Sequence, residues 1–335
     1  MDHFHARRFE NIQALRGIAA LFVVLEHVRY LSCGAFGVDI FFCISGFMAM
    51  FTTHRTREKF LRKRLIRILP FYWLMTFFTY GLVLLMPDMF ANTRAEFSFL
   101  WKSLCFVPFE ITEGVFQTLM RVGWTVNYEM FFYLLFAISC RISLKYRGLI
   151  CSGFLCVLVG LAHLLPANFV PLTFYGEFIQ LEFVLGILCY YTAKALYCRA
   201  ESRPLPFQVS LLCVPASILI FCALPLIQRS GRVTTANRLI WFGIPAALLL
   251  LLVLLAELKL TAPKLLTRLG DISFSVYLIH YYPIMLIDRR VYSLEHYSLT
   301  AVIVTVLGIL LILALSYIAW YLIENKLTGI FRKLM

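Results

Sequence analysis

A hydrophobic stretch near the N-terminus carries side chains that are suited to proton transfer. The stretch ALRGIAALFVVLEHV, residues 14–28, is apolar except for Arg16, Glu26 and His27. A histidine titrates near neutral pH, so it can take a proton from a hydroxyl group and release it again. Ionisable groups in such apolar surroundings are costly to bury and often functional. The stretch is therefore a candidate reaction centre.

The spacing of Arg16 and His27 predicts that they share one face of a helix. Eleven residues at 100° each make three full turns and about 20° more, and they span about 16 Å of helix axis. Glu26 points about 100° away. Two interpretations fit this pattern. Arg16 reaches the lipid headgroups while His27 makes a polar contact between helices, or both residues line a polar cavity through a helix bundle.

The composition is that of a membrane protein. Of the 335 residues, 61% are hydrophobic and only 15% are charged, with a mean hydropathy of +0.82, whereas about a quarter of a soluble domain is charged. Apolar runs recur at the length that a helix needs to cross a bilayer, about 17 to 25 residues. Because backbone groups in lipid must be bonded internally, these spans are helices. We expect an all-α integral membrane protein, a bundle of about ten transmembrane helices.

The ten expected spans are separated mostly by short connections. They lie at about 11–31, 36–53, 69–86, 123–140, 148–165, 177–193, 207–228, 239–257, 271–288 and 299–323. The long connection 87–122 contains FSFLWKSLCFVPFE, which is too short and broken to span and is expected to lie in the interface or to re-enter the membrane. Gly17, Gly37 and Gly46 are expected to permit close approach of helices.

The distribution of basic residues predicts the orientation. Most of the 31 lysines and arginines fall in segments on the N-terminal side of the membrane, which predicts that both termini are cytoplasmic. Arg289, Arg290 and the 229–238 loop go against this trend. The net charge of +13 is explained by orientation, so no nucleic-acid partner is expected.

The N-terminus and the cysteines give no sign of processing or metal binding. Arg7 and Arg8 precede an apolar run, as in a signal peptide, but Arg16 interrupts the run and no small-residue cleavage site follows; we expect a retained first span. The 10 cysteines form no CxxC pair and no Cys/His metal spacing, so neither a metal nor a disulfide framework is expected.

Further polar residues fall within the expected spans. Asp39 begins the second span on the outer side, while Glu129 and Glu182 lie about 10 Å into the fourth and sixth spans. Because His27 has a similar depth, the outer half of the bundle could hold a histidine–carboxylate cluster that acts as a general base. His280 falls near the midplane, where it is either catalytic or a core histidine.

The most basic stretch is EKFLRKRLIRILPFYW, residues 58–73. One interpretation is an anchor at the inner face with a helix that starts near Pro70. The other is a phosphate site in which Arg64 and Arg67 lie one turn apart. An anionic cofactor could then enter from the cytosol, with Arg16 on its route toward His27.

Five stretches resemble the acyltransferase 3 family of membrane-bound acyltransferases, in the same order. They are ALRGIAALFVVLEHV, FGVDIFFCISGFMAM, RKRLIRILPFYW, WTVNYEMFFY and ISFSVYLIHYYP. The resemblance implies an integral membrane enzyme that moves an acyl group, commonly acetyl, from cytoplasmic acetyl-CoA to a hydroxyl of a glycan or lipid-linked sugar. It also implies a catalytic role for His27 and a functional role for Arg16.

The residues and the resemblance together define a hypothesis for the site. Acyl-CoA phosphates bind near the two arginines of the basic stretch, the pantetheine arm passes Arg16 and Ser45, and His27 acts as general base, oriented by a carboxylate such as Glu129. An acyl-histidine or acyl-serine intermediate is also open. The candidate catalytic residues are His27, Arg16, Glu129 and His280, and the candidate donor-binding residues are Arg64, Arg67 and Ser45.

The expected setting is the bacterial cytoplasmic membrane. Residues 1–335 are expected to form a single transmembrane acyltransferase domain without the appended SGNH hydrolase-like domain of some family members, acting alone or with a separate partner. The acceptor and the oligomeric state stay open. The alternative function is a multi-pass transporter or flippase of a polysaccharide precursor, although no inverted repeat is visible. A third possible function is that of a scaffold in a polysaccharide-assembly complex.

Overall fold

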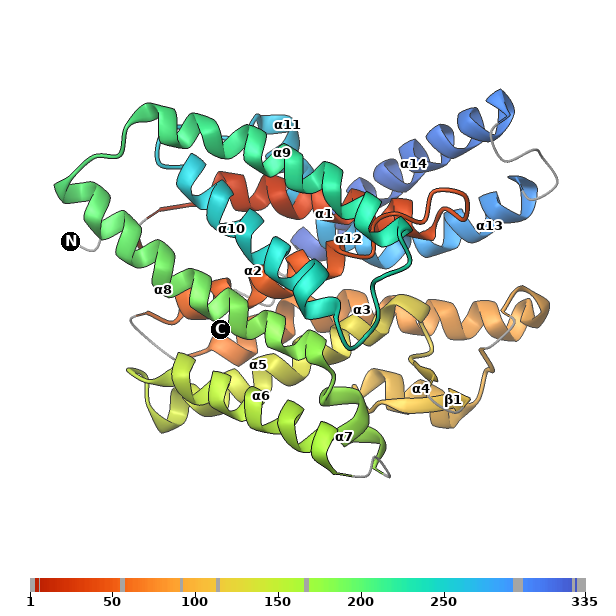
Figure 1. Cartoon of the computed structure of the whole chain (residues 1–335). Helices are drawn as coiled ribbons and strands as arrows, with labels where there is room; N and C mark the ends of the chain where they lie inside the picture. The colour runs from red at the N-terminus through yellow and green to blue at the C-terminus, as the bar shows by residue number, and fades with distance from the viewer. Residues whose placement is uncertain are drawn as a thin grey trace. The chain divides into compact units, whose positions relative to one another are not determined.

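The computed structural model describes residues 4–5, 7–54, 58–90, 93–112, 115–165, 169–291, 298–326 and 329. Within these ranges it is helical apart from one small β-hairpin (Figure 1). The elements are α1 (Glu10–His27), α2 (Gly37–Thr52), α3 (Phe60–Leu85), η1 (Pro87–Met89), α4 (Phe97–Leu104), β1 (Phe109–Thr112), β2 (Val115–Gln117), η2 (Arg121–Gly123), α5 (Trp124–Ile142), α6 (Arg147–Leu164), α7 (Val170–Tyr175), η3 (Phe178–Gln180), α8 (Leu181–Ser202), α9 (Phe207–Arg229), η4 (Leu239–Gly243), α10 (Ile244–Ala256), α11 (Lys264–Asp271), α12 (Ser273–Ile279), α13 (Tyr281–Val291), α14 (Leu299–Ala319) and η5 (Trp320–Asn325).

Six helices of the described chain are long and apolar enough to cross a membrane. They are α3, α6, η3 with α8, α9, η4 with α10, and α14 with η5. Helix α2 is apolar but shorter, with 16 residues. A multi-pass helical membrane protein is thus confirmed, whereas six of the expected ten spans meet the length and composition of a crossing helix. Helix α1 falls outside this set because its 18 residues include charged side chains.

The expected ninth span, 271–288, is not one continuous helix. The chain forms α11, α12 and α13, with interruptions at Ile272 and at His280. Pro283 accounts for the second interruption, because proline has no N–H to donate to the preceding turn. Pro283 lies in the first turn of α13. Proline is tolerated there because the N–H groups of a first turn have no partner within the helix.

The prediction of a helix start near Pro70 is wrong. Helix α3 begins at Phe60 and continues through Pro70 to Leu85. The residues before the proline contain neither glycine nor another proline, so their helix propensity extends α3 toward the N-terminus. A proline within a membrane helix is tolerated where neighbouring groups satisfy the freed carbonyl. As a result, the basic residues from Arg62 to Arg67 lie on a helix.

The connection 87–122 folds into short elements. It contains η1, α4, the antiparallel pair β1–β2 and η2. Side chains of α3 bind the end of α4 as hydrogen-bond donors: Tyr72 Oη donates to Ser103 O at 3.1 Å and Trp73 Nε1 donates to Leu104 O at 3.0 Å. These bonds satisfy carbonyl groups at a helix C-terminus, which have no partner within the helix.

The chain packs as two compact units, each assembled from separate segments. Unit 1 contains residues 1–57, 138–156 and 178–274, and unit 2 contains residues 58–137, 157–177 and 275–335. In unit 1, α2 packs on α8, α1 packs on α11, and α10 contacts α8, α9 and α2. In unit 2, α13 packs on α14 and α3 packs on α4 and η5. The structure determines the geometry within each unit.

Glycines set two close helix crossings in unit 1. A Cβ placed on Gly46 of α2 would lie 3.2 Å from the Cα of Gly186 on α8, and one on Gly17 of α1 would lie 2.8 Å from the backbone N of Gly270 on α11. A Cβ on Gly37 would lie 2.5 Å from a carbonyl oxygen of α1. The prediction that Gly17, Gly37 and Gly46 permit close packing is confirmed.

Candidate active site

His27 is the last residue of α1, in unit 1. Its Nδ1 lies 2.9 Å from the carbonyl oxygen of Val23, one turn earlier. A carbonyl oxygen can only accept a hydrogen bond, so Nδ1 carries the proton and Nε2 is the acceptor nitrogen of the neutral ring. The half-buried imidazole therefore has the tautomer that a general base needs, and its ring is held by its own helix.

Arg16 and Ser45 lie in the same unit as His27. Helix α1 is continuous from Glu10 to His27, so Arg16 and His27 share a face as their spacing predicts. Arg16 is half-buried and precedes the glycine at the α1–α11 crossing. Ser45 of α2 is buried, with 9% of its surface exposed, and it precedes the glycine at the α2–α8 crossing.

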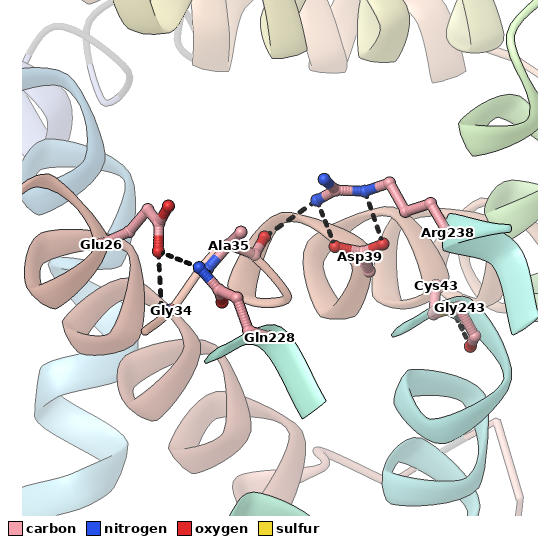
Figure 2. A network of polar contacts seen from close by, with 8 residues as sticks. All are labelled: Glu26, Gly34, Ala35, Asp39, Cys43, Gln228, Arg238 and Gly243. Carbon is pink, nitrogen blue, oxygen red and sulfur yellow. Dashed lines mark hydrogen bonds and ion pairs between the residues drawn. The ribbon is translucent and has the colours of Figure 1, made fainter. Parts of the chain in front are cut away.

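The carboxylates of unit 1 form a cluster around an arginine that the sequence did not single out. Arg238 donates to both oxygens of Asp39, from Nε at 2.9 Å and from one terminal nitrogen at 2.6 Å (Figure 2). Glu182 interacts electrostatically with both of these residues. Asp39 and Glu182 are both 0% exposed. Arg238 offsets part of the charge of Asp39 and Glu182, while the expected histidine–carboxylate cluster with His27 stays a prediction.

Glu129 lies on α5, in unit 2. It accepts a hydrogen bond of 2.6 Å from Tyr133 Oη, one turn further along the same helix. This bond orients the carboxylate. The pairing of Glu129 with His27 stays a prediction.

His280 is also in unit 2, at the turn between α12 and α13, and it is 0% exposed. Its Nδ1 lies 3.1 Å from Val276 O, so it has the same tautomer as His27. One turn earlier, Tyr277 Oη lies 2.6 Å from Thr125 Oγ1 of α5. Because Glu129 follows Thr125 by one turn, two predicted catalytic residues lie on helices that contact each other.

An apolar groove adjoins this part of unit 2. It has a volume of about 850 Å³ and is lined by α3, α12, α13, α14 and η5. Ile279 and Tyr282, on either side of His280 in the sequence, are among its lining residues. None of the described residues that line the groove is charged. The groove therefore suits the hydrocarbon part of a ligand rather than a sugar.

Arg64 and Arg67 lie in the first turns of α3, in unit 2. The guanidinium carbon of Arg64 lies 5.1 Å from the ring centre of Tyr133 and 5.5 Å from that of Phe60. Such stacking is favourable because the face of an aromatic ring attracts a cation. Arg64 and Arg67 are one turn apart on α3, and their role as a phosphate site stays a prediction.

Two buried amides were not predicted from the sequence. Asn127 of α5 and Gln180 of η3 are 0% exposed, and their side-chain amides have no hydrogen-bond partner among the described residues. Most buried polar groups are hydrogen-bonded, so both residues are candidates for contact with a substrate. The available signal was a neutral polar residue within an apolar span, and Asn127 also lies inside the stretch WTVNYE.

In the described part of the chain, no three or more histidine, cysteine, aspartate or glutamate side chains form a group that could hold a metal ion. The absence of a metal cofactor stays a prediction.

Two known proteins resemble this chain, the first over most of its length and the second over a short segment. It is 29% identical over 269 residues to the exopolysaccharide production protein ExoZ of Rhizobium meliloti (strain 1021). The matched segment covers 78% of this chain and 80% of ExoZ. A shorter segment of 73 residues, 21% of this chain and 19% of the relative, is 38% identical to the "Putative membrane-bound transacylase BcsY" of Komagataeibacter xylinus. No solved structure matches the chain significantly. The family described as "Acyltransferase domain" matches residues 9–321, and the chain therefore belongs to this acyltransferase family, as the five sequence stretches predicted.

Proposed function

We propose that the protein transfers an acetyl group from cytoplasmic acetyl-CoA to a hydroxyl of a cell-surface glycan or a lipid-linked sugar, with His27 as the general base. The observation that carries the proposal is the bond from His27 Nδ1 to Val23 O. It leaves Nε2 as the proton acceptor in an enzyme of an acyl-transferring family.

In the proposed transfer, one proton moves from the acceptor hydroxyl to His27 and then to the CoA thiolate. Nε2 of His27 removes the proton of the acceptor hydroxyl, and the resulting oxygen attacks the thioester carbonyl. The bond from carbon to sulfur then breaks, and the imidazolium returns the proton to the CoA thiolate. The products are the ester and CoA, and no other reactant is consumed. Glu129 and His280 are proposed as further catalytic residues of the same reaction.

The donor is proposed to bind through its phosphates at the first turns of α3. Arg64 and Arg67 are one turn apart on that helix, and the ring of Tyr133 beside Arg64 limits the motion of the guanidinium. Arginine is well suited to phosphate because its N–H groups pair with two oxygens. From there the pantetheine arm would extend past Arg16 and Ser45.

The acceptor class is proposed from the relatives. The name of ExoZ refers to exopolysaccharide production and that of BcsY to membrane-bound acyl transfer. Both fit an enzyme that modifies a polysaccharide or its lipid-linked precursor at a membrane. We place the protein in the bacterial cytoplasmic membrane, where acetyl-CoA is available on one side and glycan precursors are exported to the other.

The test is mass spectrometry of the surface glycans of host cells that carry the wild-type protein, His27→Ala or no protein. Wild type alone should add an acetyl-sized mass increment. His163→Ala is a matched control, because His163 of α6 makes the same type of bond, from Nδ1 to Val159 O at 2.9 Å. This control should retain the increment. All variants are first compared for their amount in the membrane.

Other outcomes would redirect the proposal. An increment that persists in His27→Ala would exclude His27 as the essential base but leave acyl transfer intact. Equal acylation in all three strains, with altered export of the glycan, would favour a transporter or flippase instead.

A further inference from the structure

Glu26 is an unusual residue for the end of a helix. It lies in the last turn of α1, directly before His27. The C-terminal end of a helix carries partial negative charge, so a carboxylate there is unfavourable. A residue that violates a local rule is expected to have a compensating interaction and often lies at a functional site.

The compensation comes from the last turn of α9. Gln228 Nε2 donates to a Glu26 carboxylate oxygen at 2.6 Å, and the backbone N–H of Gly34 donates to the same oxygen at 2.8 Å. The other end of the same amide, Gln228 Oε1, accepts from the N–H of Ala35 at 3.1 Å. One side chain therefore joins the end of α1 to the start of α2, as Figure 2 shows.

A second contact, made by an arginine, holds the connection between α1 and α2 at its α2 end. A terminal nitrogen of Arg238 donates to Ala35 O at 3.0 Å, and the same guanidinium binds both oxygens of Asp39. The peptide groups of Ala35 are thus bonded on both sides, to Gln228 and to Arg238. All of these residues belong to unit 1.

The bond of the His27 ring to Val23 determines how this network acts. Because Nδ1 is bonded to a carbonyl of α1 itself, the imidazole moves with the last turn of that helix. Helix ends are the parts of helices that fray, and α1 ends at His27, with Val28 already extended. The contacts that hold this last turn therefore also determine the position of Nε2.

We propose that Gln228 is a positioning residue for His27, acting through Glu26. The inference rests on the proposed function, in which His27 is the base. The carboxamide of Gln228 donates to Glu26 from its nitrogen and accepts from Ala35 at its oxygen at the same time, which neither a carboxylate nor an apolar side chain at this position can do. A displacement of the base of about 1 Å can lower the rate of the chemical step by up to about a hundredfold.

The experiment compares full-length variants in nanodiscs. The reaction is CoA release from acetyl-CoA with the host's extracted exopolysaccharide as acceptor. Gln228→Glu places two carboxylates together and should lower kcat about ten- to a hundredfold, with KM for acetyl-CoA and the thermal midpoint of unfolding nearly unchanged. Glu26→Gln combined with Gln228→Glu re-forms the pair with its polarity reversed and should recover most of kcat.

Two further variants keep the test decisive. Gln228→Met keeps the size of the side chain but removes its hydrogen bonds to Glu26, Ala35 and Ser32, and it should also lower kcat; it is the deciding variant if Gln228→Glu does not accumulate. Gln208→Glu changes an exposed residue in the first turn of the same helix and should behave as wild type.

Wild-type kcat in Gln228→Glu and Gln228→Met would overturn the positioning role, and so would a double variant as slow as the single one. His27→Ala is measured in parallel. If it keeps full activity, the proposed base is wrong whatever Gln228 does, so the two failures are distinguishable.

Discussion

At the scale of single residues, a glutamate distant in the sequence completes the N-terminus of α1. Phe9 precedes this helix and supplies no side-chain cap. Instead, Glu257 accepts hydrogen bonds from the backbone N–H groups of Glu10 and Asn11. Such N–H groups have no partner within the helix, and the positive end of the helix favours a carboxylate. Both ends of the helix that carries Arg16 and His27 are therefore held by side chains from later in the chain.

Glu257 predicts a pH dependence of stability. Burial raises its pKa to about 7, against an ordinary value of 4.5, although the two N–H groups lower it. Between these values the folded state keeps a proton that the unfolded state has released, so the free energy of unfolding falls as pH rises from about 4.5 to about 7. In Glu257→Gln the thermal midpoint in detergent should vary less with pH over this range. Glu201→Gln, at an exposed site, should keep the wild-type slope, and the same slope in Glu257→Gln would contradict the prediction.

At the scale of elements, most expected spans match helices because long apolar runs in a bilayer have few alternatives. Helix boundaries were less predictable. The sequence predicts a helix start near Pro70, but α3 continues through it, while Pro283 marks a restart within the expected ninth span. The same residue type has opposite consequences because the neighbouring packing, which is not local in sequence, decides whether a helix is continued.

The α2–α8 crossing predicts a sharp difference between two glycines. A Cβ at Gly46 would lie 2.2 Å from the carbonyl oxygen of Phe183, whereas a Cβ at Gly153 of α6 would meet no atom within 4 Å. Gly46→Ala should therefore lower the free energy of unfolding by about 1–3 kcal/mol through overpacking. Gly153→Ala should be neutral or stabilising by up to about 1 kcal/mol. Denaturant unfolding in micelles measures both, and equal effects would contradict the crossing.

At the scale of the whole molecule, the predicted site residues divide between the two units. Arg16, His27 and Ser45 belong to unit 1, and Arg64, Arg67, Glu129 and His280 belong to unit 2. Each unit is assembled from three segments of the chain, so neither could be recognised as a continuous stretch of sequence. Both units contain helices that are able to cross a membrane.

The orientation with both termini cytoplasmic predicts the side on which two exposed cysteines lie. Cys105 follows α4 in the connection expected outside, and Cys198 lies near the expected inner end of α8; both are exposed. A membrane-impermeant maleimide added to intact spheroplasts should label Cys105, and should label Cys198 only after permeabilisation. Cys105→Ser and Cys198→Ser assign the signals. Labelling of Cys198 alone in intact spheroplasts would invert the orientation.

The sequence by itself determined the membrane class, the helical architecture, the acyltransferase family and the paired positions of Arg16 and His27. The membrane class and the helices follow from composition, the paired positions follow from periodicity along one helix, and the family follows from the resemblance of five short stretches; all of these are local properties of the sequence. Only the tertiary structure decided the partners of these residues. Gln228, Arg238 and Glu257 lie about 200 residues or more from the groups they hold, and hydrogen bonds between such distant positions depend on how the helices pack.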